Sequence, residues 1–121
     1  MNKPTPFTRL KAGYPLCALD DIANPGARGF YFESPGGEVL SIFVTRRDQQ
    51  VSAFVNRCPH MQVPLNAAPN DFLTKAGDQI ICAKHGALFS MDSGLCSAGP
   101  CRGHYLQAVP VKLADGQVLT A

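Results

Sequence analysis

Residues 58–60 read Cys58-Pro59-His60, and residues 82–85 read Cys82-Ala83-Lys84-His85. Each motif offers one thiolate and one imidazole, and four such ligands suit either zinc or iron–sulfur chemistry. Zinc motifs tend to pair Cys with Cys and His with His, with two or more residues between the ligands. The mixed motifs instead favour two adjacent metal atoms, with each loop sending its Cys to one atom and its His to the other.

The segment around these motifs differs in composition from the rest of the chain. Residues 57–104 contain four of the five cysteines and all three histidines. They also contain Pro59, Pro64, Pro69 and Pro100, so the segment is rich in loops. Functional side chains gather on loops that a rigid scaffold positions. The sequence therefore predicts a metal site in this segment.

Short apolar runs bounded by turn residues flank the segment on both sides, which favours strands. Strands are expected over residues 28–34, 39–45 and 51–55, and a hairpin over 109–120 with its turn at Asp115-Gly116. Asp20 or Asp21 could cap one helical turn through Ala23, which Asn24-Pro25-Gly26 would end. The expected fold class is all-β.

Composition narrows the class of protein further. The chain has 121 residues, 45% hydrophobic and 17% charged, with a formal net charge of +2. This length predicts a single domain over 1–121. The small basic excess does not indicate nucleic-acid binding. Without an apolar run of membrane-spanning length or a signal peptide, we expect a cytoplasmic protein that uses its cysteines for metal or redox chemistry.

Three quoted stretches together resemble the Rieske [2Fe-2S] family, and most closely its small ferredoxin-like members. They are Cys58-Pro59-His60, then residues 82–89 (CAKHGALF), then residues 94–100 (GLCSAGP). The resemblance implies an antiparallel β-sandwich with a smaller cluster-binding subdomain of loops and short strands at about 57–107. It also implies one [2Fe-2S] cluster, with Cys58 and Cys82 on the inner iron and His60 and His85 on the outer iron. Gly99-Pro100 matches the loop that closes over the cluster.

The chain departs from the family pattern in three ways. Twenty-one residues separate His60 from Cys82, more than is usual, and we expect the surplus within residues 66–78 as a surface loop. Members that belong to the bc complex carry an extra cysteine in each ligand loop, but Gln62, Val63 and Ala83 stand here. Ala87 and Phe89 replace hydroxyl residues that would donate to the cluster. This predicts a midpoint potential in the lower half of the range of about −150 to +300 mV.

Several residues near the motifs keep more than one interpretation. Cys96 and Cys101 could form a disulfide, stay free thiols or serve a redox role. Cys17 is expected to be a buried small hydrophobe, and His104 a surface or hydrogen-bonded residue. Five apolar residues near the ligands could shield the cluster and form part of a docking rim: Met61, Pro64, Leu65, Leu88 and Pro100. Leu65, Leu88 and Phe89 could instead simply lie in the core.

The expected function is electron transfer, without catalysis by this chain alone. The sequence has no glycine-rich dinucleotide motif and no second metal set for an oxygenase. We therefore expect it to pass single electrons from a flavin-dependent reductase to a terminal oxygenase. A close alternative is the small iron–sulfur subunit of a nitrite reductase-like enzyme. Other classes left open are a zinc-stabilised interaction module and a redox-sensing regulator that uses Cys96 and Cys101.

Overall fold

The computed structural model describes residues 12–33, 36–59 and 61–121. Their strands form three antiparallel sheets with the orders β1-β10-β9, β2-β3-β4-β8 and β5-β6-β7. The strands are β1 (Pro15–Ala18), β2 (Gly26–Glu33), β3 (Val39–Arg47), β4 (Gln50–Val55), β5 (Gln79–Ile81), β6 (Leu88–Ser90), β7 (Cys96–Ala98), β8 (Ala108–Val109), β9 (Val111–Ala114) and β10 (Gln117–Thr120). The one helical element within the described residues is the 3-10 turn η1 (Leu19–Asp21). The all-β prediction is confirmed.

The strongest local turn signal gives the expected hairpin. Asp115 and Gly116 both have positive φ angles, 50° and 74°, and they connect β9 to β10 with Gln117 paired to Ala114. Two-residue hairpin loops of this type match the right-handed twist of the strands they join. β10 also pairs with β1, so this sheet joins the two ends of the described chain.

The helical turn differs from its expected form. It ends at Asp21 rather than Ala23, and neither aspartate precedes it as a cap. Instead, the Asp21 carboxylate lies inside the turn and accepts a hydrogen bond from the Ala18 N–H at 3.1 Å. A carboxylate at this position satisfies one of the amides that a helix N-terminus leaves unpaired.

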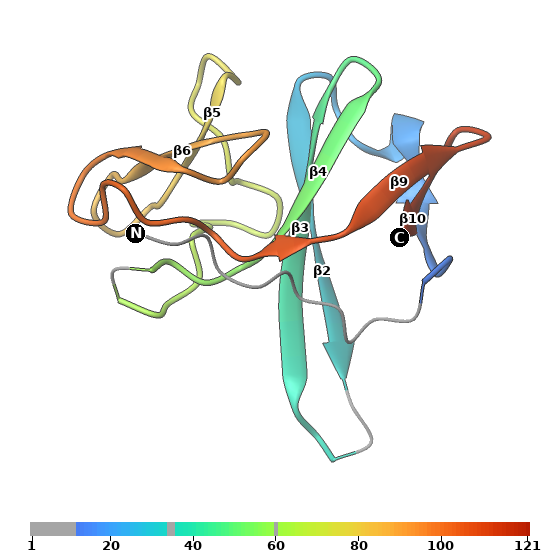
Figure 1. The fold of residues 1–121 in the computed structure, drawn as a ribbon, viewed down its shortest axis with the longest axis horizontal. Coiled ribbons are helices and arrows are strands. Elements are labelled where there is room, and N and C mark those ends of the chain that lie inside the picture. The colour runs from blue at the N-terminus through green and yellow to red at the C-terminus, as the bar shows by residue number, and fades with distance from the viewer. Residues whose placement is uncertain (1–11, 34–35, 60) are drawn as a thin grey trace.

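The central sheet is buried on both of its faces, which explains the continuous apolar run at Ile42-Phe43-Val44. Side chains alternate between the faces of a strand. Ile42 and Val44 therefore pack with Val118 on the side of the β1-β10-β9 sheet, whereas Phe43 packs with the buried residues of the β5-β6-β7 region. Figure 1 shows the central β2, β3 and β4 between the β5–β6 region and the β9–β10 hairpin.

The long segment between the two motifs is anchored to the central sheet. The Phe72 ring stacks on Phe43, with centroids 4.3 Å apart and planes 11° from parallel. The Asn70 side-chain oxygen also accepts the Gly29 N–H at 3.0 Å. Two turns occur here, with hydrogen bonds from the Asp71 N–H to the Ala68 carbonyl and from the Gly77 N–H to the Thr74 carbonyl. Most of residues 66–78 thus lie at the surface, as expected, while Phe72 and Asn70 anchor the segment to the central sheet.

Candidate metal centre

The first candidate ligand loop follows β4 directly. Its Cys58 is buried, with 1% of its surface exposed. The Cys58 N–H donates to the Val63 carbonyl at 2.7 Å, and the Gln62 N–H donates to the Cys58 carbonyl at 2.8 Å. Gln62 closes this loop with a φ of 58°, an uncommon angle for a residue with a side chain. The predicted ligand His60 lies outside the described residues.

The second loop, between β5 and β6, repeats the same backbone arrangement. The Cys82 N–H donates to the Ala87 carbonyl at 2.9 Å, and the Gly86 N–H donates to the Cys82 carbonyl at 2.9 Å. Gly86 has a φ of 71°, in the place that Gln62 holds in the first loop. Cys82 is fully buried, whereas His85 is exposed. The two motifs thus fold into equivalent loops despite their different Cys-to-His spacing.

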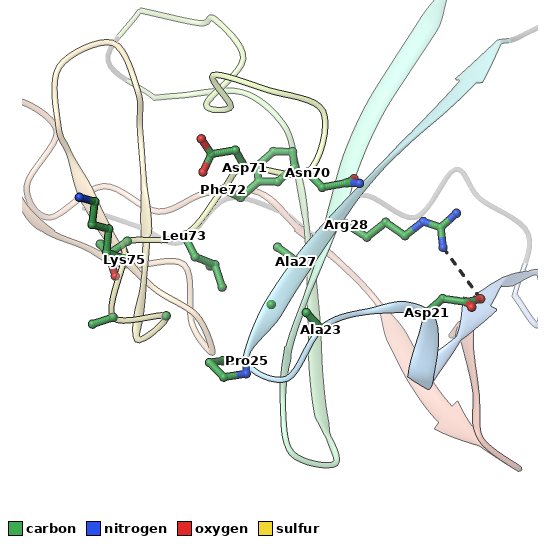
Figure 2. A pocket seen from close by; sticks show the side chains of 14 residues that line it. Asp21, Ala23, Pro25, Ala27, Arg28, Asn70, Asp71, Phe72, Leu73 and Lys75 are labelled. Carbon is green, nitrogen blue, oxygen red and sulfur yellow. Dashed lines mark ion pairs between the residues drawn. The ribbon is translucent and has the colours of Figure 1, made fainter.

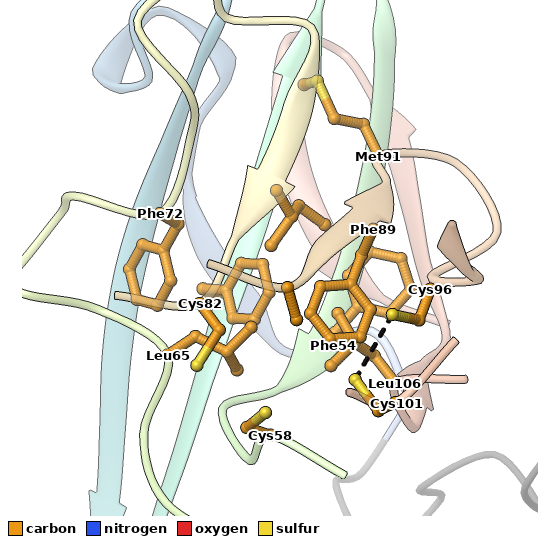
Figure 3. Packing of buried hydrophobic residues seen from close by; sticks show 13 residues of the cluster. Phe54, Cys58, Leu65, Phe72, Cys82, Phe89, Met91, Cys96, Cys101 and Leu106 are labelled. Atoms are coloured by element: carbon orange, nitrogen blue, oxygen red, sulfur yellow. Dashed lines mark hydrogen bonds between the residues drawn. The ribbon is translucent and has the colours of Figure 1, made fainter. Parts of the chain in front are cut away.

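A backbone hydrogen bond holds these loops beside each other. The Ala83 N–H, next to Cys82, donates to the Leu65 carbonyl at 2.8 Å. Leu65 is fully buried and belongs to the same apolar cluster as both cysteines. Figure 3 shows the Cys58 and Cys82 sulfurs at one end of this cluster, with Met91 at the other. The structure therefore brings the two predicted cysteine ligands to one end of one core.

Asn56 positions the first loop, and the sequence analysis missed it. Its side-chain oxygen accepts the Leu65 N–H at 2.8 Å, and its side-chain amide donates to Asn66 at 2.9 Å and Ser41 at 3.2 Å. Asn56 is buried, with 6% of its surface exposed. One sequence signal could have identified Asn56. It is a polar residue that follows an apolar strand and comes immediately before a ligand loop.

A third loop covers the side of the second one. The expected Gly99-Pro100 stretch lies there, and a Cβ atom on Gly99 would be 2.8 Å from the Ala87 Cα. Cys96 and Cys101 flank this stretch as free buried thiols, with their sulfurs 3.3 Å apart. Burial raises the pKa of the Cys101 thiol to about 12, and the neighbouring Cys96 thiol adds to the increase. A redox role for this pair stays a prediction.

The remaining candidate residues take several places. His104 is half-buried and, with Arg57, Pro59, Gln62, Val55, Tyr105 and Gln107, lines a recess of about 270 Å³ beside the first loop. Cys17 is half-buried and packs against the apolar cluster of Ile42, Val44 and Val118, on the other side of the central sheet. It is therefore less buried than expected.

The apolar residues near the ligands divide between the core and the surface. Leu65 and Phe89 are fully buried, and Leu88 is half-buried. Met61, Pro64 and Pro100 are exposed, with 52% of the Met61 surface accessible. The core interpretation therefore holds for Leu65 and Phe89, while three of the six residues remain available at the surface.

A larger recess lies away from the ligand loops. It has a volume of about 710 Å³ and is bordered by β2 and the segment from Asn70 to Gly77 (Figure 2). The Arg28–Asp21 ion pair, with its atoms 3.9 Å apart, lies at its rim. Of the predicted ligands that the structure describes, Cys58, Cys82 and His85, none lines this recess.

The described candidate ligands are Cys58, Cys82 and His85. Within the described residues, which leave out His60, no three His, Cys, Asp or Glu side chains are grouped to hold one metal. A Rieske cluster needs only two protein ligands on each iron, two Cys on one and two His on the other. The two buried thiols and the exposed His85 imidazole are three of the four side chains of such a set, and the fourth, His60, stays a prediction.

Comparisons with known proteins agree with this chemistry. A family model for the Rieske [2Fe-2S] domain matches residues 13–112. No curated protein sequence matches the chain. In the part of the chain that the structure describes, no helix has the length and apolar character to cross a membrane.

Three similar solved structures are ferredoxins. The ferredoxin of carbazole 1,9a-dioxygenase from Nocardioides aromaticivorans IC177 is 22% identical, with a TM-score of 0.69 over 92% of this chain and 98% of its own. The Sphingomonas yanoikuyae B1 ferredoxin is 25% identical, with a TM-score of 0.67 over 89% and 96%. A third, 27% identical with a TM-score of 0.65 over 88% and 90%, comes from a complex of reduced oxygenase and oxidised ferredoxin in carbazole 1,9a-dioxygenase.

Proposed function

The chain belongs to the Rieske [2Fe-2S] domain family, and on this premise we propose which residues hold its cluster and which proteins exchange electrons with it. The proposed ligands are Cys58, His60, Cys82 and His85, within a cluster-binding subdomain at about 57–107. When bound, the cluster supplies a one-electron redox couple. The protein is a ferredoxin-like electron carrier and not a catalyst on its own.

The pair of equivalent loops carries the ligand proposal. Each loop fixes its cysteine by two backbone hydrogen bonds, and the Leu65 carbonyl joins the loops. Burial of Cys58 and Cys82 excludes water from the thiolates, whereas exposed His85 places an imidazole edge at the surface. This side chain offers the electron a short path between the protein interior and a partner.

We propose a terminal oxygenase as the electron acceptor and a flavin-dependent reductase as the donor. A similar ferredoxin occurs in a complex with the oxygenase of carbazole 1,9a-dioxygenase, which supports an oxygenase partner here. The sequence lacks a glycine-rich dinucleotide motif, so another protein must convert a hydride into single electrons. We also propose a cytoplasmic location, where a reducing environment would keep the Cys96 and Cys101 thiols unpaired.

Metal analysis and EPR spectroscopy test the ligand assignment. Protein made under iron-replete, anaerobic conditions should be reddish-brown and contain about two irons per chain. After reduction it should give a rhombic EPR signal with a low average g value. We expect alanine at any of the four ligands to abolish the signal, while Cys17→Ala and His104→Ala keep it. A colourless protein with stoichiometric zinc would overturn the proposal.

A further inference from the structure

We infer that the surface around the cluster ligands docks onto an acidic patch of a protein redox partner. We name this surface the ligand end and define it by the described residues 57–59 with 61–65 (the first segment), 82–87 (the second) and 98–104 (the third). The inference rests on the proposed function, because it concerns the partner that would receive or deliver the electron.

The three segments of the ligand end lie against one another. The hydrogen bond from Ala83 to Leu65 joins the first segment to the second. The close approach of Gly99 to Ala87 joins the third segment to the second. The recess beside the first loop is lined by both Arg57 and His104, which joins the first segment to the third. The three segments therefore form one continuous surface around the candidate ligands.

Each segment carries one exposed cation and no carboxylate. The cations are Arg57, Lys84 and Arg102. Among the described residues, no carboxylate lies within ion-pairing distance of them, since the two ion pairs use Arg28 and Arg46. The Arg102 side chain is held at the surface by a hydrogen bond from its Nε to the Ser97 carbonyl at 3.2 Å. The net charge of only +2 thus conceals a local basic surface.

Asp78 and Asp92, the acidic residues nearest in sequence to the second and third segments, lie away from this end. Asp92 follows Met91, which Figure 3 places at the opposite end of the buried cluster from Cys58. Asp78 lies near Met91 too, because Arg47 donates both to the Asp78 carbonyl and to the Met91 sulfur. These two acidic residues therefore lie toward the Met91 end of the cluster, away from the Cys58 and Cys82 sulfurs.

Exposed apolar groups among the cations favour a protein partner over a nucleic acid. Met61 is one of four large hydrophobic side chains exposed in the described structure, and it lies in the first ligand loop. Pro64 and Pro100 are exposed on the same surface. Protein interfaces combine an apolar centre that contains Met and Arg with a polar rim, whereas a phosphate backbone needs mainly cations.

The recess of about 270 Å³ offers a specific place for a partner carboxylate. The residues that line it include Arg57, His104 and Gln62, whose side chains contain hydrogen-bond donors. An aspartate or glutamate that entered here would stand beside the first ligand loop. Such a contact would fix the distance between the two redox centres.

Anion mapping by NMR tests the surface without electron transfer. The redox-inert trianion hexacyanochromate(III) is titrated into the oxidised holoprotein, and broadening of backbone amide signals locates its binding. We expect the observable amides of the ligand end to broaden and that of Lys112 on β9 to stay sharp. At about 0.1 M ionic strength, Lys84→Glu should weaken binding about tenfold, because a trianion feels two charge units within a Debye length. Lys112→Glu changes the net charge by the same amount, but it should change the affinity for the trianion by less than about twofold.

Stopped-flow oxidation of the reduced protein gives a second measurement. Each reduced protein transfers one electron to Co(III), giving Co(II), in tris(oxalato)cobaltate(III) or hexaamminecobalt(III). We expect Lys84→Glu and Arg57→Glu to slow the reaction with the anionic complex and speed that with the cationic one, whereas Lys112→Glu has little effect on either. Measured midpoint potentials of the variants correct for any change in driving force.

Different results identify which idea fails. Equal effects of Lys84→Glu and Lys112→Glu, or broadening centred on Lys112, would overturn the docking surface. Retardation of duplex DNA by the wild-type protein at the same salt, lost in Lys84→Glu, would assign the surface to nucleic acid and also overturn it. If the protein cannot be reduced, the proposed electron-transfer function is wrong. The binding of hexacyanochromate(III) still tests the docking surface in that case.

Discussion

Gly99 lies against the backbone of Ala87, so closely that a Cβ atom on Gly99 would stand 2.8 Å from the Ala87 Cα. Its φ of 99° is also one that residues with side chains rarely adopt. Two independent constraints therefore require glycine at this point of the third loop. They keep the loop in contact with the second ligand loop, whose Ala87 carbonyl accepts the Cys82 N–H.

We expect Gly99→Ala to lower the free energy of unfolding by about 2–4 kcal/mol, through backbone strain and a steric clash together. It should also speed the loss of iron to a chelator. Gly103→Ala is the matched control, because Gly103 has a φ of 89° but no atom within 4 Å of its Cβ position. Urea unfolding of both holoproteins measures the difference. Equal losses would show that the contact with Ala87 contributes nothing.

The buried Asn56 side chain should stabilise the first ligand loop. Asn56→Ala removes the acceptor of the Leu65 N–H and leaves that buried donor unpaired, at a cost of about 1–3 kcal/mol. We expect faster iron release as well, because Leu65 ends the loop that begins at Cys58. Ser41→Ala removes only the weaker partner, at 3.2 Å, and should cost less than about 1 kcal/mol. Iron release as slow as in the wild type would show that the Asn56 side chain does not stabilise the first ligand loop.

Local chemistry explains which features the sequence could predict. The Asp115-Gly116 hairpin depends on two adjacent residues that adopt positive φ, and the ligand loops depend on residues a few positions apart. Asn56 could not be identified so easily, since its role depends on Ser41 and Asn66, which only the fold brings together. The three-residue strands β5, β6 and β7 are too short for a period to show. The place of His60 stays a prediction.

The stacked pair of Phe43 and Phe72 should anchor the segment between the ligand motifs to the central sheet. Phe72 is buried, with 1% of its surface exposed, so Phe72→Ala should lower the free energy of unfolding by about 3–5 kcal/mol. Tyr31→Ala is the control, because Tyr31 is 65% exposed and should change stability by less than about 0.5 kcal/mol. Proteolysis would measure the local effect, with cleavage between residues 66 and 78 expected first in the Phe72 variant. Unchanged stability and cleavage would contradict the anchoring role.

The half-buried Cys17 thiol should make stability decrease at alkaline pH. Burial raises the pKa of Cys17 above its ordinary value of 9.0, against the opposing charge of Arg28, while the Asp21 carboxylate adds to the increase. The folded chain then holds this proton more tightly than the unfolded chain does. The stabilising contribution is complete below the ordinary pKa and is lost as the pH rises through the folded-state pKa. The urea midpoint should therefore decrease less between about pH 8 and about pH 10 in Cys17→Ser than in the wild type. Parallel declines in the two proteins would show that Cys17 stays protonated in both states or titrates equally in both.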